Sequence, residues 1–178
     1  MIDPLITLVI SVSLALLFFM AARHKMSSLA EFEGQLAAYE ILPAALVPTA
    51  ARLLPIVEMA VVFLILIPMT RSFAAFLAVL LLSTYALAMA VNILRGRKDI
   101  DCGCGGQPQV LSVWLVVRNV VLVLGSSLLL TPGAQRSVAW SDMPFLILMT
   151  AVLAMVYLLV EQLVRNQSVM THRSSSNG

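Results

Sequence analysis

Five long apolar segments constrain the fold of this 178-residue chain more than any other feature. They are Leu5–Ala22, Leu53–Met69, Phe73–Leu94, Val110–Leu130 and Pro144–Val164. A helix needs about 20 predominantly apolar residues to cross a bilayer, within a range of about 17–25. Charged residues make up 11% of the chain, against about 25% in a typical soluble domain. The sequence therefore predicts an all-α polytopic membrane bundle of about five transmembrane helices, forming a single domain over residues 1–165. The polar, Ser-rich residues 166–178 are expected to be a disordered tail.

Two of the apolar segments need separate arguments. The first is expected to be a permanent helix, because a secretory signal has its basic residues before the apolar core. Here Arg23 and Lys25 come after that core. The second segment is marginal as a crossing, because Pro55 and Glu58 interrupt its apolar run.

The positions of the basic residues predict an orientation. Lys and Arg in short loops are retained on the cytoplasmic side of a membrane. With the N-terminus outside, eight basic residues fall inside and two outside. The inside set is Arg23, Lys25, Arg52, Arg95, Arg97, Lys98, Arg165 and Arg173, and the outside set is Arg71 and Arg136. We expect a multi-pass protein of the bacterial inner (cell) membrane with a cytoplasmic C-terminus. No basic stripe is interleaved with aromatic residues, so no nucleic-acid partner is expected.

A short helix is predicted between the first two crossings. Ser28-Leu29-Ala30-Glu31 fits a capping box, in which Ser28 caps the helix and Glu31 reaches back. The apolar residues Leu29, Phe32, Leu36 and Tyr39 then recur at helical spacing and share one face. Such a segment is either an amphipathic helix in the membrane interface or an ordinary connector folded against the bundle. Pro43 and Pro48 are expected to end it.

Cys102-Gly103-Cys104, in a short charged loop, is the one chemically reactive element of the sequence. A disulfide needs its Cα atoms within about 7 Å. Residues two apart can meet that limit, because Gly103 can take backbone angles that are closed to other residues. The ring is small, so the bond would be strained, easily reduced and of little value as a brace. The pair therefore favours thiol–disulfide exchange, with Cys102 and Cys104 as catalytic residues of a membrane oxidoreductase.

Two other interpretations of the cysteine pair stay open. Thiolates also suit soft ions such as Cu(I) or Zn. Two thiolates make an incomplete site, with His24 and His172 as the only other obvious donors, so no metal is assigned. The pair can also be a glycine-rich turn that happens to contain cysteines.

Glu58 and Arg118 are charged residues well inside apolar segments. A charge near the middle of a bilayer costs at least about 2.5–3.5 kcal/mol on insertion scales. Counted from Leu53 and Leu111, at about 1.5 Å per residue, the two charges lie roughly 8 and 10 Å deep. The sequence therefore predicts a Glu58–Arg118 ion pair inside the bundle, beneath the cysteine loop. The alternative is that each side chain reaches the interface separately.

Two stretches of the chain resemble the methylamine utilisation protein MauE family, which is grouped with DoxX-like membrane proteins. One stretch runs from Lys25 through Glu58 and ends in Arg52-Leu53-Leu54-Pro55-Ile56-Val57-Glu58. The other is Asp101-Cys102-Gly103-Cys104-Gly105-Gly106, which looks like the cysteine signature of that family. The resemblance covers most of residues 1–165.

The resemblance implies a role in making methylamine dehydrogenase, a periplasmic enzyme with a disulfide-rich small (β) subunit. Proteins of the family are thought to assist the processing, export or disulfide formation of that subunit. A periplasmic thioredoxin-like protein, MauD, is the implied partner, besides the membrane lipid. The alternatives are a small transporter for a soft metal or a thiol compound, and a membrane assembly platform without redox chemistry.

The orientation and the implied client lie on opposite sides of the membrane. The positive charges place the cysteine pair on the cytoplasmic side, whereas the disulfides that it would serve are periplasmic. Either electrons cross from the cytoplasm, or the orientation is reversed. A single pair does not form a relay across about 30 Å of hydrocarbon. A membrane quinone would complete such a path, although no residue in the sequence demands one.

Overall fold

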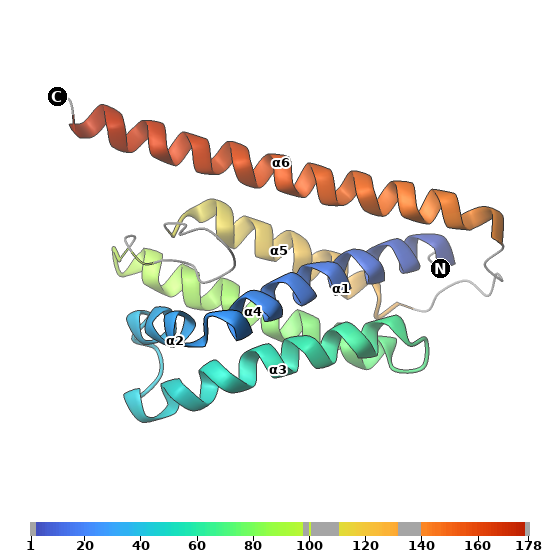
Figure 1. Ribbon diagram of the computed structural model, residues 1–178, viewed down its shortest axis with the longest axis horizontal. Helices are drawn as coiled ribbons and strands as arrows, with labels where there is room; N and C mark the ends of the chain where they lie inside the picture. Colours follow the sequence, from blue (N-terminus) through green and yellow to red (C-terminus); the bar gives the residue numbers. More distant parts are fainter. Residues whose placement is uncertain (1–2, 98–99, 101–110, 132–139, 177–178) are drawn as a thin grey trace.

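The computed structural model describes residues 3–97, 100, 111–131 and 140–176, apart from the side chains of residues 141, 164, 165 and 167–176. Within these ranges the chain forms six α-helices and no strand. They are α1 (Pro4–Ser27), α2 (Leu29–Ala38), α3 (Val47–Leu66), α4 (Arg71–Leu94), α5 (Val113–Leu128) and α6 (Met143–Ser176), with short 3₁₀-helices at Ala44–Leu46 and Trp140–Asp142. The long helices lie side by side, and α2 lies at one end of them (Figure 1). The predicted all-α bundle is confirmed.

Four of the described helical stretches are long and apolar enough to cross a membrane. They are Pro4–Ser27, Ala44–Leu66, Arg71–Leu94 and Met143–Leu163. Helix α5 has 16 residues, which extend about 24 Å, so it is shorter than the 21 residues expected for it. Large apolar side chains such as Phe63, Leu87 and Ile147 point outward and are more than 60% exposed. An outer surface of this kind suits contact with lipid rather than water.

Helix α3 begins at Val47, six residues before the predicted start of the second crossing. Pro48 lies in its first turn, where a missing N–H has no helical partner to lose. Pro55 lies inside the helix and is buried against neighbouring helices. Packing against neighbours lets membrane helices tolerate an internal proline. The segment that looked marginal in the sequence is therefore a full-length helix.

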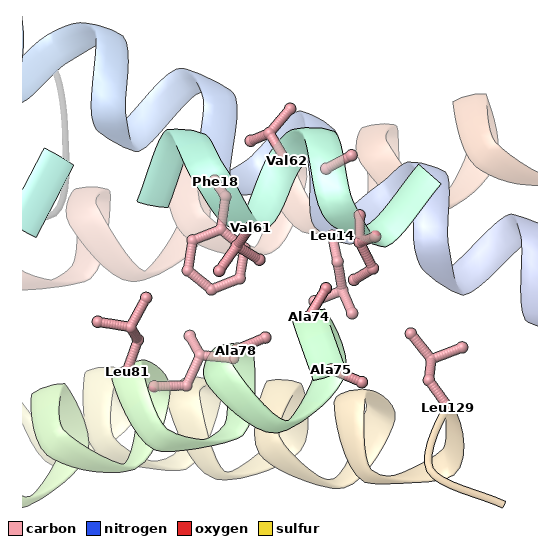
Figure 2. Close-up of a cluster of buried hydrophobic side chains, with 12 residues drawn as sticks. Leu14, Phe18, Val61, Val62, Ala74, Ala75, Ala78, Leu81 and Leu129 are labelled. Carbon is pink, nitrogen blue, oxygen red and sulfur yellow. The ribbon is translucent and has the colours of Figure 1, made fainter. Parts of the chain in front are cut away.

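The main core lies between α1, α3 and α4. Figure 2 shows Phe18 and Leu14 of α1 with Val61 and Val62 of α3 above the small residues of α4. These small residues are Ala74, Ala75 and Ala78, and all three are fully buried. Small side chains let helix backbones approach closely, which is how membrane helices gain van der Waals contact.

Helix α2 follows α1 almost without a break. The N–H of Ser28 donates to the carbonyl oxygen of His24, and the side chain of Ser28 makes no cap hydrogen bond. The predicted helix is therefore confirmed and Ser28 directly precedes it, but the predicted cap hydrogen bond is absent, and Ser28 forms the non-helical turn between α1 and α2. Phe32 and Tyr39 are buried, and α2 packs on α3. This packing favours the connector folded against the bundle.

Helix α6 lies along the outside of the bundle, next to α1 (Figure 1). Its apolar residues are mostly exposed, and among those described only Thr150 is buried. Its helical backbone continues through residues 166–176, where the sequence predicts a disordered tail. The stretch is polar, but it contains neither proline nor glycine to end the helix.

Candidate functional site

A cavity of about 580 Å³ lies among α1, α3, α4, α5 and α6. Most of its wall is apolar, including Phe18 of α1 and Leu122 of α5. The polar side chains in this wall include two groups that form contacts with each other, Lys25, Glu58 and Tyr85 on one side and Arg118, Tyr157 and Glu161 on the other. A mostly apolar cavity of this size with a few converging polar groups is typical of a ligand site.

Lys25 and Glu58 form a buried ion pair in the wall of this cavity. The Lys25 ammonium donates a hydrogen bond to Glu58 Oε1, and the side chains are 5% and 1% exposed. The hydroxyl of Tyr85 donates to the same oxygen at 2.7 Å. Two donors therefore meet one carboxylate oxygen in an environment of low dielectric, where the pairing is strong.

The Lys25 ammonium also lies over two aromatic rings. It is 5.1 Å from the centroid of the Phe32 ring and 4.6 Å from that of Tyr85. Both distances are within the range of a cation–π interaction. Since Phe32 belongs to α2, Glu58 to α3 and Tyr85 to α4, this one side chain of α1 joins four helices.

A second charged group lies on the α5–α6 side of the cavity. Arg118 Nη1 donates to the Tyr157 hydroxyl at 3.2 Å and lies 3.4 Å from Glu161 Oε1. The side chains of Arg118 and Glu161 are 11% and 22% exposed. Because α6 packs mainly on α1, this polar contact across the cavity is a principal link between α5 and α6.

The predicted Glu58–Arg118 ion pair is wrong. Glu58 pairs with Lys25, and Arg118 pairs with Glu161, although both predicted residues line the same cavity. The sequence argument treated Lys25 as a loop residue, because the apolar run ends at Ala22. The helix instead continues to Ser27 and carries Lys25 inward.

The sequence did not single out Lys25, because the run from Leu5 to Ala22 is apolar or small on almost every side of the helix. The buried residues of α1 include Ser11, Leu14, Ala15, Phe18, Ala22 and Lys25. Their spacing of three or four residues marks one helix face, apart from the adjacent pair 14–15. Lys25 continues that face in the structure, so it is buried and needs an acidic partner.

The end of α4 has a defined geometry that starts the loop towards α5. Gly96 has φ of +76°, which is open to glycine and rare for other residues. Its N–H donates to Ile93, and the N–H of Arg97 donates to Asn92, both at 3.0 Å. This is a Schellman motif. The Arg97 guanidinium then lies 2.7 Å from the carboxylate of Glu40, just after α2.

The two described positions that flank residues 101–110 are joined. The N–H of Leu111 donates to the carbonyl oxygen of Ile100 at 3.2 Å. Leu111 is buried in an apolar cluster with Tyr39, Met89 and Leu115, and the partly buried Ile100 packs against this cluster. Tyr85 packs against this cluster and also bonds Glu58, so it connects the cavity to the base of the loop.

Cys102, Gly103 and Cys104 lie outside the described residues, so their predicted role stays a prediction. Asn92 of α4 and Asn119 of α5 are buried, and their side chains donate to the carbonyl oxygens of Ala88 and Leu115. Within the described ranges, no three His, Cys, Asp or Glu side chains gather as metal ligands do.

Comparison with known proteins identifies the family. The model of the methylamine utilisation protein MauE family matches residues 3–132, which contain α1 to α5. The Methylamine utilization protein MauE of Paracoccus denitrificans is 42% identical over 125 residues, covering 68% of this chain and 67% of its own. That of Methylophilus methylotrophus is 40% identical over 110 residues, covering 62% and 58%, respectively. That of Paracoccus versutus is 37% identical over 145 residues, covering 77% and 78%.

No solved structure matches the chain. The family model nevertheless spans most of its length, and relatives in two genera agree with it. The chain therefore belongs to the methylamine utilisation protein MauE family.

Proposed function

We propose that this protein is a membrane maturation factor for methylamine dehydrogenase. It assists disulfide formation in the small subunit of that enzyme by thiol–disulfide exchange at Cys102 and Cys104. The family supports a role in methylamine utilisation, and the dehydrogenase step is the proposal. The supporting observation is the hydrogen bond between Leu111 and Ile100, which closes the base of the segment that carries both cysteines.

The exchange is a balanced two-electron reaction. A thiolate of a reduced thioredoxin-like partner attacks the Cys102–Cys104 disulfide, and one cysteine leaves as a thiolate. The second partner thiolate then attacks the mixed disulfide and releases the other cysteine. The partner becomes oxidised and can accept electrons from its client. The pair becomes a dithiol that holds the two electrons.

A second reaction must remove those electrons. We assign it to a membrane quinone, which takes two electrons and two protons to become a quinol. The dithiol loses the same two electrons and two protons and becomes a disulfide again. The exchange with a periplasmic partner requires the cysteine loop to face the periplasm. The basic residues instead predict a cytoplasmic position, so the orientation decides between direct exchange and a longer electron route.

Thiol labelling in intact cells tests the orientation. A maleimide that cannot cross the membrane reacts with Cys102 and Cys104, after mild reduction, if they face the periplasm. The Cys102→Ser/Cys104→Ser variant is the blank, and lysed cells give the maximum signal. Labelling in intact cells supports direct exchange. Labelling only after lysis contradicts it and supports the orientation that the charges predict.

Single and double cysteine variants test the exchange itself. Cys104→Ser leaves the Cys102 thiolate, which is expected to attack the disulfide of the oxidised thioredoxin-like partner. One partner sulfur leaves as a thiolate, and the mixed disulfide accumulates and is visible on a non-reducing gel. The double serine variant gives no such band and yields little active methylamine dehydrogenase. If the enzyme matures normally in the double variant, the redox role is wrong and a non-redox assembly platform is supported. If soft-metal tolerance changes while the enzyme matures, a transporter is supported.

A further inference from the structure

We propose that the cavity among α1, α3, α4, α5 and α6 binds the head group of a membrane quinone, which accepts the electrons of the cysteine pair. The identity of the electron source rests on the proposed function. The binding site is argued from the cavity itself. A volume of about 580 Å³ lies within the range of about 300–1,000 Å³ that is usual for small-molecule sites.

The cavity is open on one side, towards surfaces that suit lipid. Met20 of α1 and Leu158 of α6 line it, and their side chains are 64% and 55% exposed. In a helical membrane protein, exposed apolar side chains of this kind contact acyl chains. A lipid-soluble molecule therefore enters the cavity from the bilayer without crossing water, and its apolar tail stays between the helices and the lipid.

Glu58 supplies the main argument for a bound ligand. Glu58 is fully buried, and its Oε1 atom accepts hydrogen bonds from both Lys25 and Tyr85. Its other oxygen, Oε2, is buried and has no hydrogen-bond partner among the described residues. An unsatisfied buried acceptor is costly and needs an explanation. The hydroxyl group of a quinol supplies the donor that this atom needs.

Arg118 and Tyr157 supply the complementary groups. The guanidinium of Arg118 and the hydroxyl of Tyr157 line the same cavity and are donors. The carbonyl oxygens of an oxidised quinone accept such hydrogen bonds. The cavity thus offers donors to the oxidised form of the ligand and an acceptor to the reduced form.

The charges and the wall exclude other ligand classes. Three cationic side chains line the cavity, Arg23, Lys25 and Arg118, against two acidic ones, Glu58 and Glu161. An organic cation is therefore disfavoured by the excess of positive charge. A small hydrated anion would lose its water against a mostly apolar wall, which is costly for a charged group. A neutral ring that carries carbonyl groups suits both the positive charge of the cavity and its mostly apolar wall.

The site is connected to Ile100 and Leu111, the described residues on either side of positions 101–110. Tyr85 bonds Glu58 in the cavity wall and packs against the apolar cluster that contains Ile100 and Leu111.

The reaction consumes one dithiol and one quinone and gives one disulfide and one quinol. The two electrons and two protons released by the thiols are those taken up by the quinone.

Binding is tested with a short-chain ubiquinone and purified protein in phospholipid nanodiscs. Isothermal titration calorimetry gives its Kd for the wild type, for Arg118→Gln and for Tyr157→Phe. Arg97→Gln is the matched control, since Arg97 pairs with Glu40 outside the cavity. Arg118→Gln is expected to weaken binding at least about tenfold, the effect of losing one charge-assisted hydrogen bond. Arg97→Gln leaves the Kd unchanged.

Several outcomes overturn the site. It is wrong if the wild type shows no saturable binding, or if folded Arg118→Gln and Tyr157→Phe both bind as the wild type does. It is also wrong if Arg97→Gln weakens binding as much as Arg118→Gln. Thermal melting of each variant identifies loss of fold, and Tyr157→Phe keeps the test valid if Arg118→Gln does not fold.

A second measurement separates this inference from the proposed function. The reduced protein is mixed with the same quinone, and quinol formation is followed by absorbance. The Cys102→Ser/Cys104→Ser variant should bind the quinone with the wild-type Kd and produce no quinol. If the wild type binds the quinone but produces no quinol, the proposed redox function fails and the site stands. If quinol forms equally fast in Arg118→Gln and the wild type, the site fails and the redox function stands.

Discussion

The ammonium group of Lys25, near the end of α1, is paired with the carboxylate of Glu58 inside α3, and both side chains are almost fully buried. With exposed fractions of 5% and 1%, both side chains are largely removed from bulk solvent. Removing one member of such a pair leaves an uncompensated charge in a medium of low dielectric. The loss of stability is therefore expected to be largest when only one member of the pair is substituted.

Lys25→Met and Glu58→Met are each expected to lower the free energy of unfolding by about 3–5 kcal/mol, because each leaves a buried charge alone. The double variant should cost much less than the sum of the two single losses, since apolar residues replace a buried ion pair nearly neutrally. Unfolding titrations in detergent micelles measure these values.

Arg97→Met is the control for the buried pair. Arg97 pairs with Glu40, but these side chains are 35% and 68% exposed. An exposed ion pair contributes about 0–1 kcal/mol. If Lys25→Met costs no more than Arg97→Met, the buried pair is not a stabilising contact of the folded protein.

Arg118→Met is expected to loosen α6. The guanidinium group bonds Tyr157 and Glu161, whereas the apolar side chains of α6 are largely exposed. A loss of about 1–2 kcal/mol in local stability corresponds to about 5–30-fold faster opening. Amide hydrogen exchange, read by mass spectrometry over residues 143–163, should increase by that factor. Exchange in α3 should stay unchanged. Equal protection of α6 in the wild type and in Arg118→Met would show that Arg118 does not hold α6 on α5.

Two glycine-to-alanine substitutions should change stability in opposite directions. Gly96→Ala forces alanine to a φ of +76° and is expected to cost about 1–2 kcal/mol. Gly34→Ala lies inside α2, where an added Cβ meets no atom within 4 Å, and should stabilise by about 0.5–1 kcal/mol. Thermal melting of both variants checks the signs. A stabilising Gly96→Ala would show that the end of α4 does not have the Schellman geometry.

Ala78→Leu is expected to destabilise the core between α1, α3 and α4. Ala78 is fully buried opposite Phe18 and Val61, so extra methyl groups displace one of the helices (Figure 2). Overpacking of this kind costs about 1–3 kcal/mol. Ala60→Leu makes the same change at an exposed position of α3 and should stay within about 0.5 kcal/mol of the wild type. Equal melting temperatures for the two variants would rule out close packing at Ala78.

The sequence determined the class of this protein because hydrophobicity is a local property. The absence of charge between Phe73 and Val91 is enough to predict one membrane helix, and the structure has α4 there. The spacing of Phe32 and Tyr39 likewise predicted α2 and its buried face. The family was also recognisable from two short stretches, since a match of residue types needs no tertiary information.

Tertiary structure decided how the helices end and how the charges pair. Local rules stopped the first crossing at Ala22 and delayed the second to Leu53, but packing carries α1 to Ser27 and starts α3 at Val47. Those shifts turned Lys25 inward and gave Glu58 a partner 33 positions away in the chain. Composition identifies Glu58 and Arg118 as buried charges, but the choice of partner depends on which helices touch. Packing between helices that are distant in the sequence makes that choice. No residue pattern along a single helix contains the information about which helices will touch.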